Sequence, residues 1–194
     1  MILEIVKYGH PVLRQKGGRI GPVTPALQRL AADMLETMHD AKGVGLAAQQ
    51  IGQAVQLTVL DIRGVTDRPS TLEIGGKQMN PEAHMPLVLI NPDITPLTPH
   101  VKGPEGCLSF PEIFGEISRP EGVRVRALNE HGEPVEFCCG GLLAKAIQHE
   151  HDHLHGILFI DRMDKATKEE LRPDLEALQA ATKAELQKPV RKSG

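Results

Sequence analysis

The sequence has no tryptophan, and aromatic residues make up only 3% of its 194 residues. A hydrophobic core must therefore consist mainly of Leu, Ile, Val, Ala and Met side chains. Nowhere do about 18 apolar residues follow one another, which is the length that a membrane-spanning helix needs. The N-terminal stretch shows neither a long apolar run nor a small-residue cleavage site, so we expect a soluble, untargeted protein. A chain of this length fits one domain.

Cysteine is also scarce, and positive charge is not in excess. The three cysteines, Cys107, Cys138 and Cys139, cannot all pair within one chain, and the adjacent two are poorly placed to bridge each other. We therefore expect a cytoplasmic protein, in a reducing compartment, with Cys138 and Cys139 as structural strand residues. Lys and Arg number 22 against 25 Asp and Glu, so broad nucleic-acid binding is not expected and any RNA contact must be local.

Helical periodicity predicts two well-defined helices. The first has Thr24 as its cap, Pro25 in its first turn and an apolar face that ends at Gly43. The second covers residues 142–154, where an apolar stripe recurs at helical spacing and Gly156 offers a C-terminal stop. Each helix should pack its apolar face on a sheet.

The rest of the chain favours strands and one more helix. Alternating patterns predict strands at 55–62, 87–90, 123–128 and 134–139, the last two joined by a turn. Residues 64–85 are polar and rich in Gly and Pro, which predicts a long excursion or an extended hairpin. From Thr167 onward we expect a terminal helix that is interrupted near Pro173, followed by disorder at 188–194.

The segment with the richest chemistry is QHEHDHLHG, residues 148–156. Residues four apart on a helix lie about 40° apart around its axis, so His149 and His153 can present two imidazoles to one divalent metal. Glu150 follows directly and can take a proton from water without acting as a ligand. An isolated histidine pair is more often a surface feature, but the intervening Glu and the apolar stripe favour a metal site.

The same segment holds a second pair, His151 and His155, also four residues apart. His151 lies about 200° around the helix from His149, so this pair faces the other way and we expect it to be solvent-exposed. His155 stands at the helix end beside Gly156, a poor platform for a precise ligand. We therefore favour the first pair as ligands, with Asp152 as a residue that orients one of them.

A catalytic metal needs a third protein ligand and an open position. Cys107 is the candidate, because it lies in the segment EGCLS, residues 105–109, where Gly106 lets the backbone approach a ligand closely. Its thiolate suits a soft or borderline metal. Taken alone, a cysteine is more often a buried structural thiol.

A third segment, GVGLAAQQ at residues 43–50, combines two glycines with two alanines. Its functional interpretation is a strand-like edge that pairs with an extended peptide and ends in Gln50, whose amide can donate to a developing oxyanion. The alternatives are a phosphate-binding loop or tight packing alone. No Lys, Ser or Thr follows at the spacing of a P-loop, so we set nucleotide binding aside.

In this order, GVGLAAQQ, EGCLS and QHEHDHLHG resemble the three signature motifs of peptide deformylases. The stretch YGHPVLR and residues 141–159 are similar to the same family, so the resemblance covers most of residues 1–164. It implies an α+β fold in which antiparallel sheets surround a central metal-binding helix. We accordingly expect a catalytic region at 1–164, followed at 165–194 by a C-terminal helix and flexible tail of the same domain.

The resemblance also implies roles for the motif residues. The implied metal ligands are Cys107, His149 and His153. The implied catalytic groups are Glu150 as general acid and base, and Gln50 with the backbone N–H of Leu108 as stabilisers of the oxyanion. The implied substrate contacts are Val44, Gly45, Leu46 and Gly106 along the peptide, and Leu142 and Ala146 in the methionine pocket.

The activity that the resemblance implies is removal of the formyl group from the N-terminal formyl-methionine of nascent polypeptides, with release of formate. The implied cofactor is one divalent metal ion, Fe(II) in the cell, with Zn, Ni and Co as alternatives. The expected partners are formyl-methionyl nascent peptides and, through the basic end at 188–192, a transient ribosome contact, although a solvated tail is the simpler interpretation. No membrane or sequence-specific nucleic acid is expected.

Two departures from the family and two rival functions stay open. Residues 110–115 lack the arginine that some members place there to meet the peptide, and the segment 65–86 looks long enough to cover the site or join an interface. A gluzincin-type metallopeptidase would use Glu169 or Glu170 as its third ligand. A catalytically silent relative would use the edge at 43–50 only to hold peptides.

Overall fold

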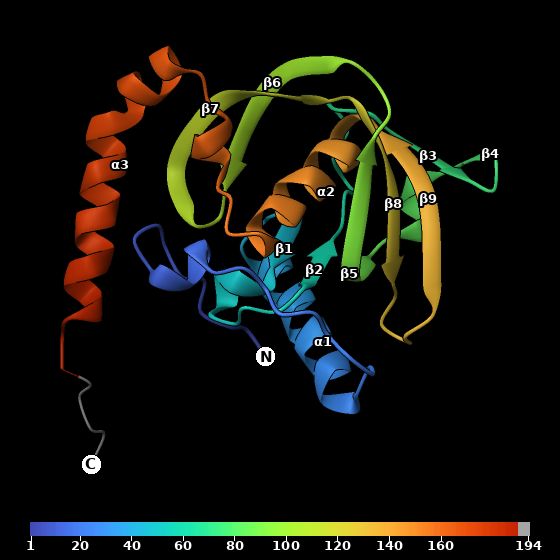
Figure 1. Cartoon of the computed structure of the whole chain (residues 1–194), viewed down its shortest axis with the longest axis horizontal. Coiled ribbons are helices and arrows are strands. Elements are labelled where there is room, and N and C mark those ends of the chain that lie inside the picture. Colours follow the sequence, from blue (N-terminus) through green and yellow to red (C-terminus); the bar gives the residue numbers. More distant parts are fainter. Residues whose placement is uncertain (190–194) are drawn as a thin grey trace.

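Antiparallel strands and three α-helices make up the structure, a computed structural model that describes residues 1–189 (Figure 1). The strands are β1 (Gly45–Ala47), β2 (Leu57–Leu60), β3 (Ser70–Ile74), β4 (Lys77–Met79), β5 (Leu87–Pro96), β6 (His100–Cys107), β7 (Phe110–Pro120), β8 (Gly122–Leu128) and β9 (Pro134–Gly140). The α-helices are α1 (Pro25–Asp40), α2 (Gly141–Leu154) and α3 (Lys165–Leu186). Short 3-10 helices lie at Pro11–Arg14, Ala48–Ile51, Pro81–His84 and Phe159–Arg162.

Two sheets surround α2, which confirms the expected α+β architecture (Figure 1). The larger sheet has the strand order β1-β2-β5-β8-β9-β3-β4 and is antiparallel throughout. The smaller sheet is the β6–β7 hairpin, which the sequence patterns did not predict. Because β1 is the first strand of the larger sheet, one of its edges is left without a strand partner among the described residues. Gly45 at this edge and residues of β6 line one cavity.

All four predicted strands are present, although β2 is shorter than the predicted run 55–62 and β5 extends beyond the predicted run 87–90 to Pro96. In β8 and β9 buried residues alternate with exposed ones, and the turn between them sets the register Leu128↔Pro134. The Gly- and Pro-rich excursion at 64–85 contains the predicted hairpin, formed by β3 and β4, and β3 pairs with β9. Cys138 and Cys139 lie in β9 as expected, and both are free thiols.

The first predicted helix is confirmed as α1. Thr24 Oγ1 accepts a hydrogen bond from the Leu27 N–H at 3.2 Å, and Pro25 occupies the first turn, where its missing N–H costs nothing. Met34 and Met38 are completely buried in a cluster with residues of β2 and β5. The methionines thus fill core volume that the scarce aromatics do not.

The second predicted helix is confirmed as α2, and its C-terminal end is held firmly. Gly156 has a φ of +72°, and a Cβ there would lie 2.5 Å from the Arg14 carbonyl oxygen. The Ile157 N–H bonds the Asp152 carbonyl at 3.0 Å, as in a capped helix end, and the Gly17 N–H bonds the Leu154 carbonyl at 2.8 Å. The end of the helix is therefore fixed by its own cap and by the N-terminal segment.

The predicted interruption near Pro173 is wrong, because α3 runs through that residue without a break. Proline removes one backbone hydrogen bond from a helix interior. The loss is offset by packing on both sides of Pro173: Leu171, Leu175 and Leu178 contact one apolar cluster. The predicted disorder at 188–194 falls mostly on residues 190–194, which lie outside the described part.

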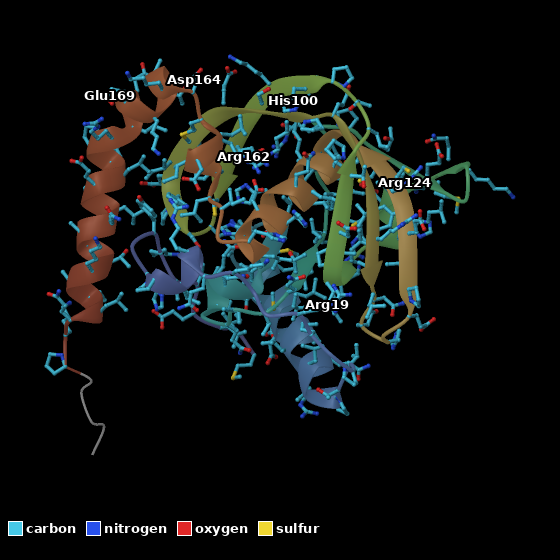
Figure 2. All side chains as sticks on the ribbon, viewed as in Figure 1. Arg19, His100, Arg124, Arg162, Asp164 and Glu169 are labelled. Carbon is cyan, nitrogen blue, oxygen red and sulfur yellow. The ribbon has the colours of Figure 1, made fainter. Side chains whose placement is uncertain are left out.

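Charged side chains lie mainly on the outside, as the labelled Arg124 and Glu169 show in Figure 2. Among residues 1–189, no helix is both long and apolar enough to cross a membrane.

We expect the Leu143→Ala variant to lose about 2–5 kcal/mol of unfolding free energy, because Leu143 is completely buried between α2 and the larger sheet. Urea unfolding followed by circular dichroism measures the loss. Leu186→Ala, at a leucine that is 49% exposed at the end of α3, serves as the control and should change stability little. Equal losses in the two variants would contradict this account of the core.

Candidate active site

The site is built on the buried face of α2. His149, Glu150 and His153 are only 8%, 4% and 1% exposed, and the two imidazole ring centroids lie 5.0 Å apart. Spacing of four residues on the helix brings the rings together, as the sequence predicts. Burial beneath the smaller sheet, which sequence patterns cannot predict, removes these residues from solvent.

Cys107 lies at the end of β6, in the smaller sheet. A shift of the β6–β7 register between Gly106 and Cys107 marks this point, and the Cys107 sulfur lies 3.4 Å from His153 Nε2. One potential ligand atom from each of Cys107, His149 and His153 lies within 4.8 Å of the others. Ligand bonds of about 2.0–2.3 Å around a tetrahedral ion require such convergence, so the three residues fit one divalent metal and leave a fourth position open.

Glu105 orients one of these residues. Its carboxylate accepts a hydrogen bond from His149 Nδ1 at 3.1 Å, so the hydrogen sits on Nδ1 and the lone pair of Nε2 is available to a metal. Arg119 also donates to Glu105. Burial raises the pKa of Glu105, but the hydrogen bonds from His149 and Arg119 outweigh it and lower the pKa to about 2. Glu105 is therefore ionised near neutral pH.

Asp152, predicted to orient a ligand, is linked to His149 only indirectly. It accepts from Arg119 at 2.9 Å and from Arg162 at 2.8 Å, and its carboxylate is hydrogen-bonded to neither His149 nor His153 within residues 1–189. Its contact with Arg119 continues through Glu105 to the His149 imidazole. The role expected for Asp152 therefore stays a prediction, and its only route to His149 among residues 1–189 runs through Arg119 and Glu105.

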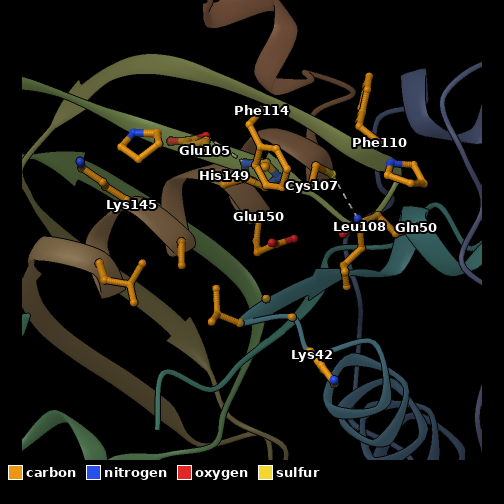
Figure 3. Close-up of a pocket in the computed structure, with 18 of the residues that line it drawn as sticks. Lys42, Gln50, Glu105, Cys107, Leu108, Phe110, Phe114, Lys145, His149 and Glu150 are labelled. Atoms are coloured by element: carbon orange, nitrogen blue, oxygen red, sulfur yellow. Dashed lines mark hydrogen bonds and ion pairs between the residues drawn. The ribbon is translucent and has the colours of Figure 1, made fainter. Parts of the chain in front are cut away.

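The Glu150 carboxylate is buried in the wall of the site. Its Oε2 is buried and has no hydrogen-bond partner among residues 1–189, and burial raises its pKa to about 7. Figure 3 shows the side chain in the middle of the pocket, below Cys107 and His149. A Cβ at Gly45 would lie 2.5 Å from Glu150 Oε1, so the absence of a side chain in β1 leaves room for this carboxylate.

Gln50 and the turn after Cys107 complete the polar side of the pocket. Gln50 Oε1 accepts the Ala47 N–H at 2.9 Å, which orients the amide so that Nε2 donates to Ser109 Oγ at 3.2 Å and to Cys107 Sγ at 3.5 Å (Figure 3). Leu108 lies in the turn between β6 and β7, and its carbonyl accepts from Lys7 Nζ at 3.1 Å.

These groups open into a cavity of about 710 Å³ between β1, β6 and α2. A volume of this size accommodates a short peptide segment. The lining residues that the sequence singled out are Val44, Gly45, Gln50, Gly106, Cys107, Leu108, Leu142, Ala146, His149 and Glu150. Two others that it singled out, Leu46 and His153, are fully buried in the wall behind the cavity.

The second histidine pair differs from its prediction. His151 and His155 are half-buried rather than solvent-exposed, and their ring centroids lie 4.4 Å apart. The expectation failed because the helix end that carries them packs against other segments, as the Gly17 N–H bond to Leu154 shows. They face away from the catalytic cavity, as their place on the helix predicts.

Sequence patterns missed the supporting residues Glu105, Arg119 and Ser109. Arg119 is only 3% exposed and Ser109 is completely buried, yet neither stands in a pattern that marks a buried polar residue. An Arg near the end of a strand of mixed polarity, as Arg119 is in β7, is interpreted as a surface residue unless its partners are known. The rival third ligands Glu169 and Glu170 are exposed on α3, and Glu169 pairs with Arg172, outside the ligand cluster.

Comparison with known sequences agrees with this geometry. A family model described as polypeptide deformylase matches residues 2–169. The peptide deformylase of Opitutus terrae is 48% identical over 186 residues, which are 95% of this chain and 96% of the relative. The peptide deformylase of Methylacidiphilum infernorum is 46% identical over 178 residues, 92% and 93% of the two chains.

Solved structures share the fold over nearly the whole chain. A plant peptide deformylase matches with a TM-score of 0.82 at 35% identity, covering 98% of this chain and 96% of that one. The peptide deformylase of Thermus thermophilus matches with a TM-score of 0.78 at 37% identity, covering 93% and 99%. The chain therefore belongs to the polypeptide deformylase family, metal-dependent hydrolases that remove the formyl group from the N-terminal formyl-methionine of newly made polypeptides.

Proposed function

We propose that Cys107, His149 and His153 hold one divalent metal ion in this enzyme and that Glu150 is its general acid and base. The observation that carries the proposal is the buried Glu150 carboxylate, whose Oε2 has no partner within residues 1–189 and which lies beside three convergent ligands. A surface cluster of histidines would need neither the burial nor the Cys from a second sheet. A silent peptide-binding relative would gain nothing from a desolvated carboxylate at this point.

The substrate peptide binds as an added strand along β1. Val44, Gly45 and Leu46 offer backbone groups on an edge that no described strand covers, and Gly106 lies on the other side of the cavity. The methionine side chain enters the apolar part lined by Leu142 and Ala146. Steric exclusion by Leu46 and Cys107 accounts for the choice of a formyl over an acetyl group, because the added methyl collides with this wall.

Glu150 moves the proton during hydrolysis. When bound, the metal supplies Lewis-acid activation of the water and the formyl carbonyl. Glu150 takes a proton from the attacking water and gives it to the amine nitrogen as the C–N bond breaks. A pKa near neutrality suits both transfers, because the carboxyl group gains and loses a proton at little cost. The products are formate and a free N-terminus.

Gln50 and the Leu108 backbone N–H stabilise the negative charge that develops on the formyl oxygen. The Ala47 N–H holds the Gln50 amide in place before substrate arrives, so little reorganisation is needed. In the free enzyme Ser109 Oγ accepts a hydrogen bond from Gln50 Nε2, so this amide donor has a partner before the substrate binds.

For the metal we propose Fe(II), with Zn, Ni and Co as alternatives that the same Cys and His ligands accept. A thiolate beside ferrous iron predicts oxygen sensitivity. Three free cysteines support a reducing cytoplasm as the place of action. We treat 1–164 as catalytic and α3 as part of the same domain, because Leu175 is buried in one cluster with Phe110 and Ile160. A transient ribosome contact through 188–192 stays a prediction.

We expect the Glu150→Gln variant to release formate from a formyl-Met peptide about 10²- to 10⁴-fold more slowly, because the neutral amide cannot accept the proton. The measurement is formate release by protein loaded anaerobically with Fe(II), with metal content determined in parallel. An acetyl-Met peptide is the control and should yield no acetate. An unchanged rate with bound metal would overturn the role of Glu150, and no release by the wild type would favour a peptide-binding protein.

We expect the Cys107→Ala variant to lose the catalytic metal, because two imidazoles alone hold it weakly. Glu169→Ala is the matched control, since a metallopeptidase of the gluzincin kind needs a glutamate ligand on a later helix. Metal content after dialysis, measured by mass spectrometry, distinguishes the deformylase ligand set from that of a gluzincin-type metallopeptidase. Retention by Cys107→Ala together with loss by Glu169→Ala would reverse the ligand assignment.

We expect the Gly45→Ala variant to lower kcat about 10²-fold, because its Cβ would stand 2.5 Å from Glu150 Oε1 and must displace the carboxylate. Gly21→Ala is the control, since nothing lies within 4 Å of a Cβ there. Both variants should keep their metal and their melting temperature. A Gly45→Ala enzyme with full kcat would show that Glu150 tolerates displacement.

A further inference from the structure

A second histidine pair on α2 is not used by the proposed chemistry. His151 and His155 lie four residues apart on the helix face opposite to His149 and His153. Their ring centroids are 4.4 Å apart, closer than the 5.0 Å between the rings of the catalytic pair. The same helical spacing that converges two imidazoles in the cavity therefore converges two more outside it.

The hydrogen bonding of His155 leaves one ring nitrogen free. His155 Nδ1 donates to the His151 carbonyl oxygen at 2.9 Å, and since a carbonyl only accepts, the hydrogen sits on Nδ1 and Nε2 keeps its lone pair. Histidines that bind metals commonly donate their other N–H to a carbonyl or carboxylate in this way. The arrangement is the counterpart of His149, whose Nδ1 donates to Glu105.

Apart from the bond between His155 Nδ1 and the His151 carbonyl, neither ring forms a hydrogen bond or an ion pair with another residue of 1–189. The histidine ion pairs within residues 1–189 involve His39, His131 and His149 only. Both His151 and His155 are half-buried, so their rings are restricted but still reach solvent. Little conformational freedom remains to be lost when the two rings bind a common ion.

The backbone beneath the pair is rigid, although a helix end is usually a poor platform for ligands. The N–H groups of His155 and Ile157 both bond the Asp152 carbonyl, at 2.9 and 3.0 Å. Gly156 fits against the Arg14 carbonyl so closely that no Cβ is tolerated. A cation at this place also meets the negative end of the α2 dipole.

We propose that His151 and His155 form a second metal site, a surface chelate for a divalent transition-metal ion such as Ni(II) or Zn(II). Imidazole ligands suit these ions. The site has two protein ligands, because the three-ligand cluster found among residues 1–189 is the catalytic one, and water completes the coordination. Its ion is therefore held more weakly than the catalytic metal and exchanges with solution. Because the ion binds only the folded helix, it stabilises the protein.

Equilibrium dialysis against Ni(II) tests the proposal. Enzyme that carries one equivalent of Ni(II) is dialysed against a series of free Ni(II) concentrations, and bound nickel is counted by mass spectrometry. We expect a second equivalent to bind to the wild type and to His131→Ala, a control at an exposed histidine in the β8–β9 turn. In His151→Ala and in His155→Ala the second equivalent should bind at least about tenfold more weakly.

His151→Ala is the sharper variant, because the carbonyl that accepts from His155 belongs to the backbone and survives the substitution. Excess Ni(II) should raise the melting temperature of the wild type but not of this variant, while formate release stays unchanged. Cys107→Ala should keep the second site and lose the first, so a failure of the proposed catalytic ligands is seen separately. The proposal is overturned if the wild type saturates at one equivalent, or if both pair variants keep the second.

Discussion

A buried network of charges fixes the catalytic centre. Arg119, only 3% exposed, lies between Glu105 of β6 and Asp152 of α2 and donates to both. The network therefore joins the smaller sheet to the central helix, and with it the two parts of the chain that supply the proposed ligands. Removal of one partner from a buried ion pair costs about 3–5 kcal/mol, because the remaining charge is left uncompensated. The position of Cys107 relative to α2 depends on this constraint.

Each face of α2, the helix that carries Asp152, has a different role. Its apolar stripe, with Leu143 and Ile147 almost completely buried, fills the core against the larger sheet. The catalytic face presents His149 and Glu150 to the cavity. The remaining side carries the half-buried pair His151 and His155. Periodicity of 3.6 residues makes this division possible, because neighbours in sequence point about 100° apart.

Much of the fold could be predicted because the signals are local. Thr24 and Pro25 mark the start of α1 by chemistry that acts within one turn, and alternation marks β8 and β9. The β6–β7 hairpin escaped prediction because it is long, shifted in register after Gly106 and mixed in polarity. The interruption predicted near Pro173 was wrong because a tertiary effect outweighed a local one. Proline disfavours a helix interior, but the packing of α3 on the core compensates for that preference.

The sequence by itself determined the residue types of the proposed ligands, the spacing of His149 and His153, and the order of the three motifs. It did so because helical geometry converts a four-residue spacing directly into proximity. Only the tertiary structure decided that Cys107 reaches His153 across 46 residues, that Glu105 fixes the imidazole, and that Glu150 is buried enough to raise its pKa. These features depend on contacts between distant segments, and burial of a charge is set by whatever packs over it.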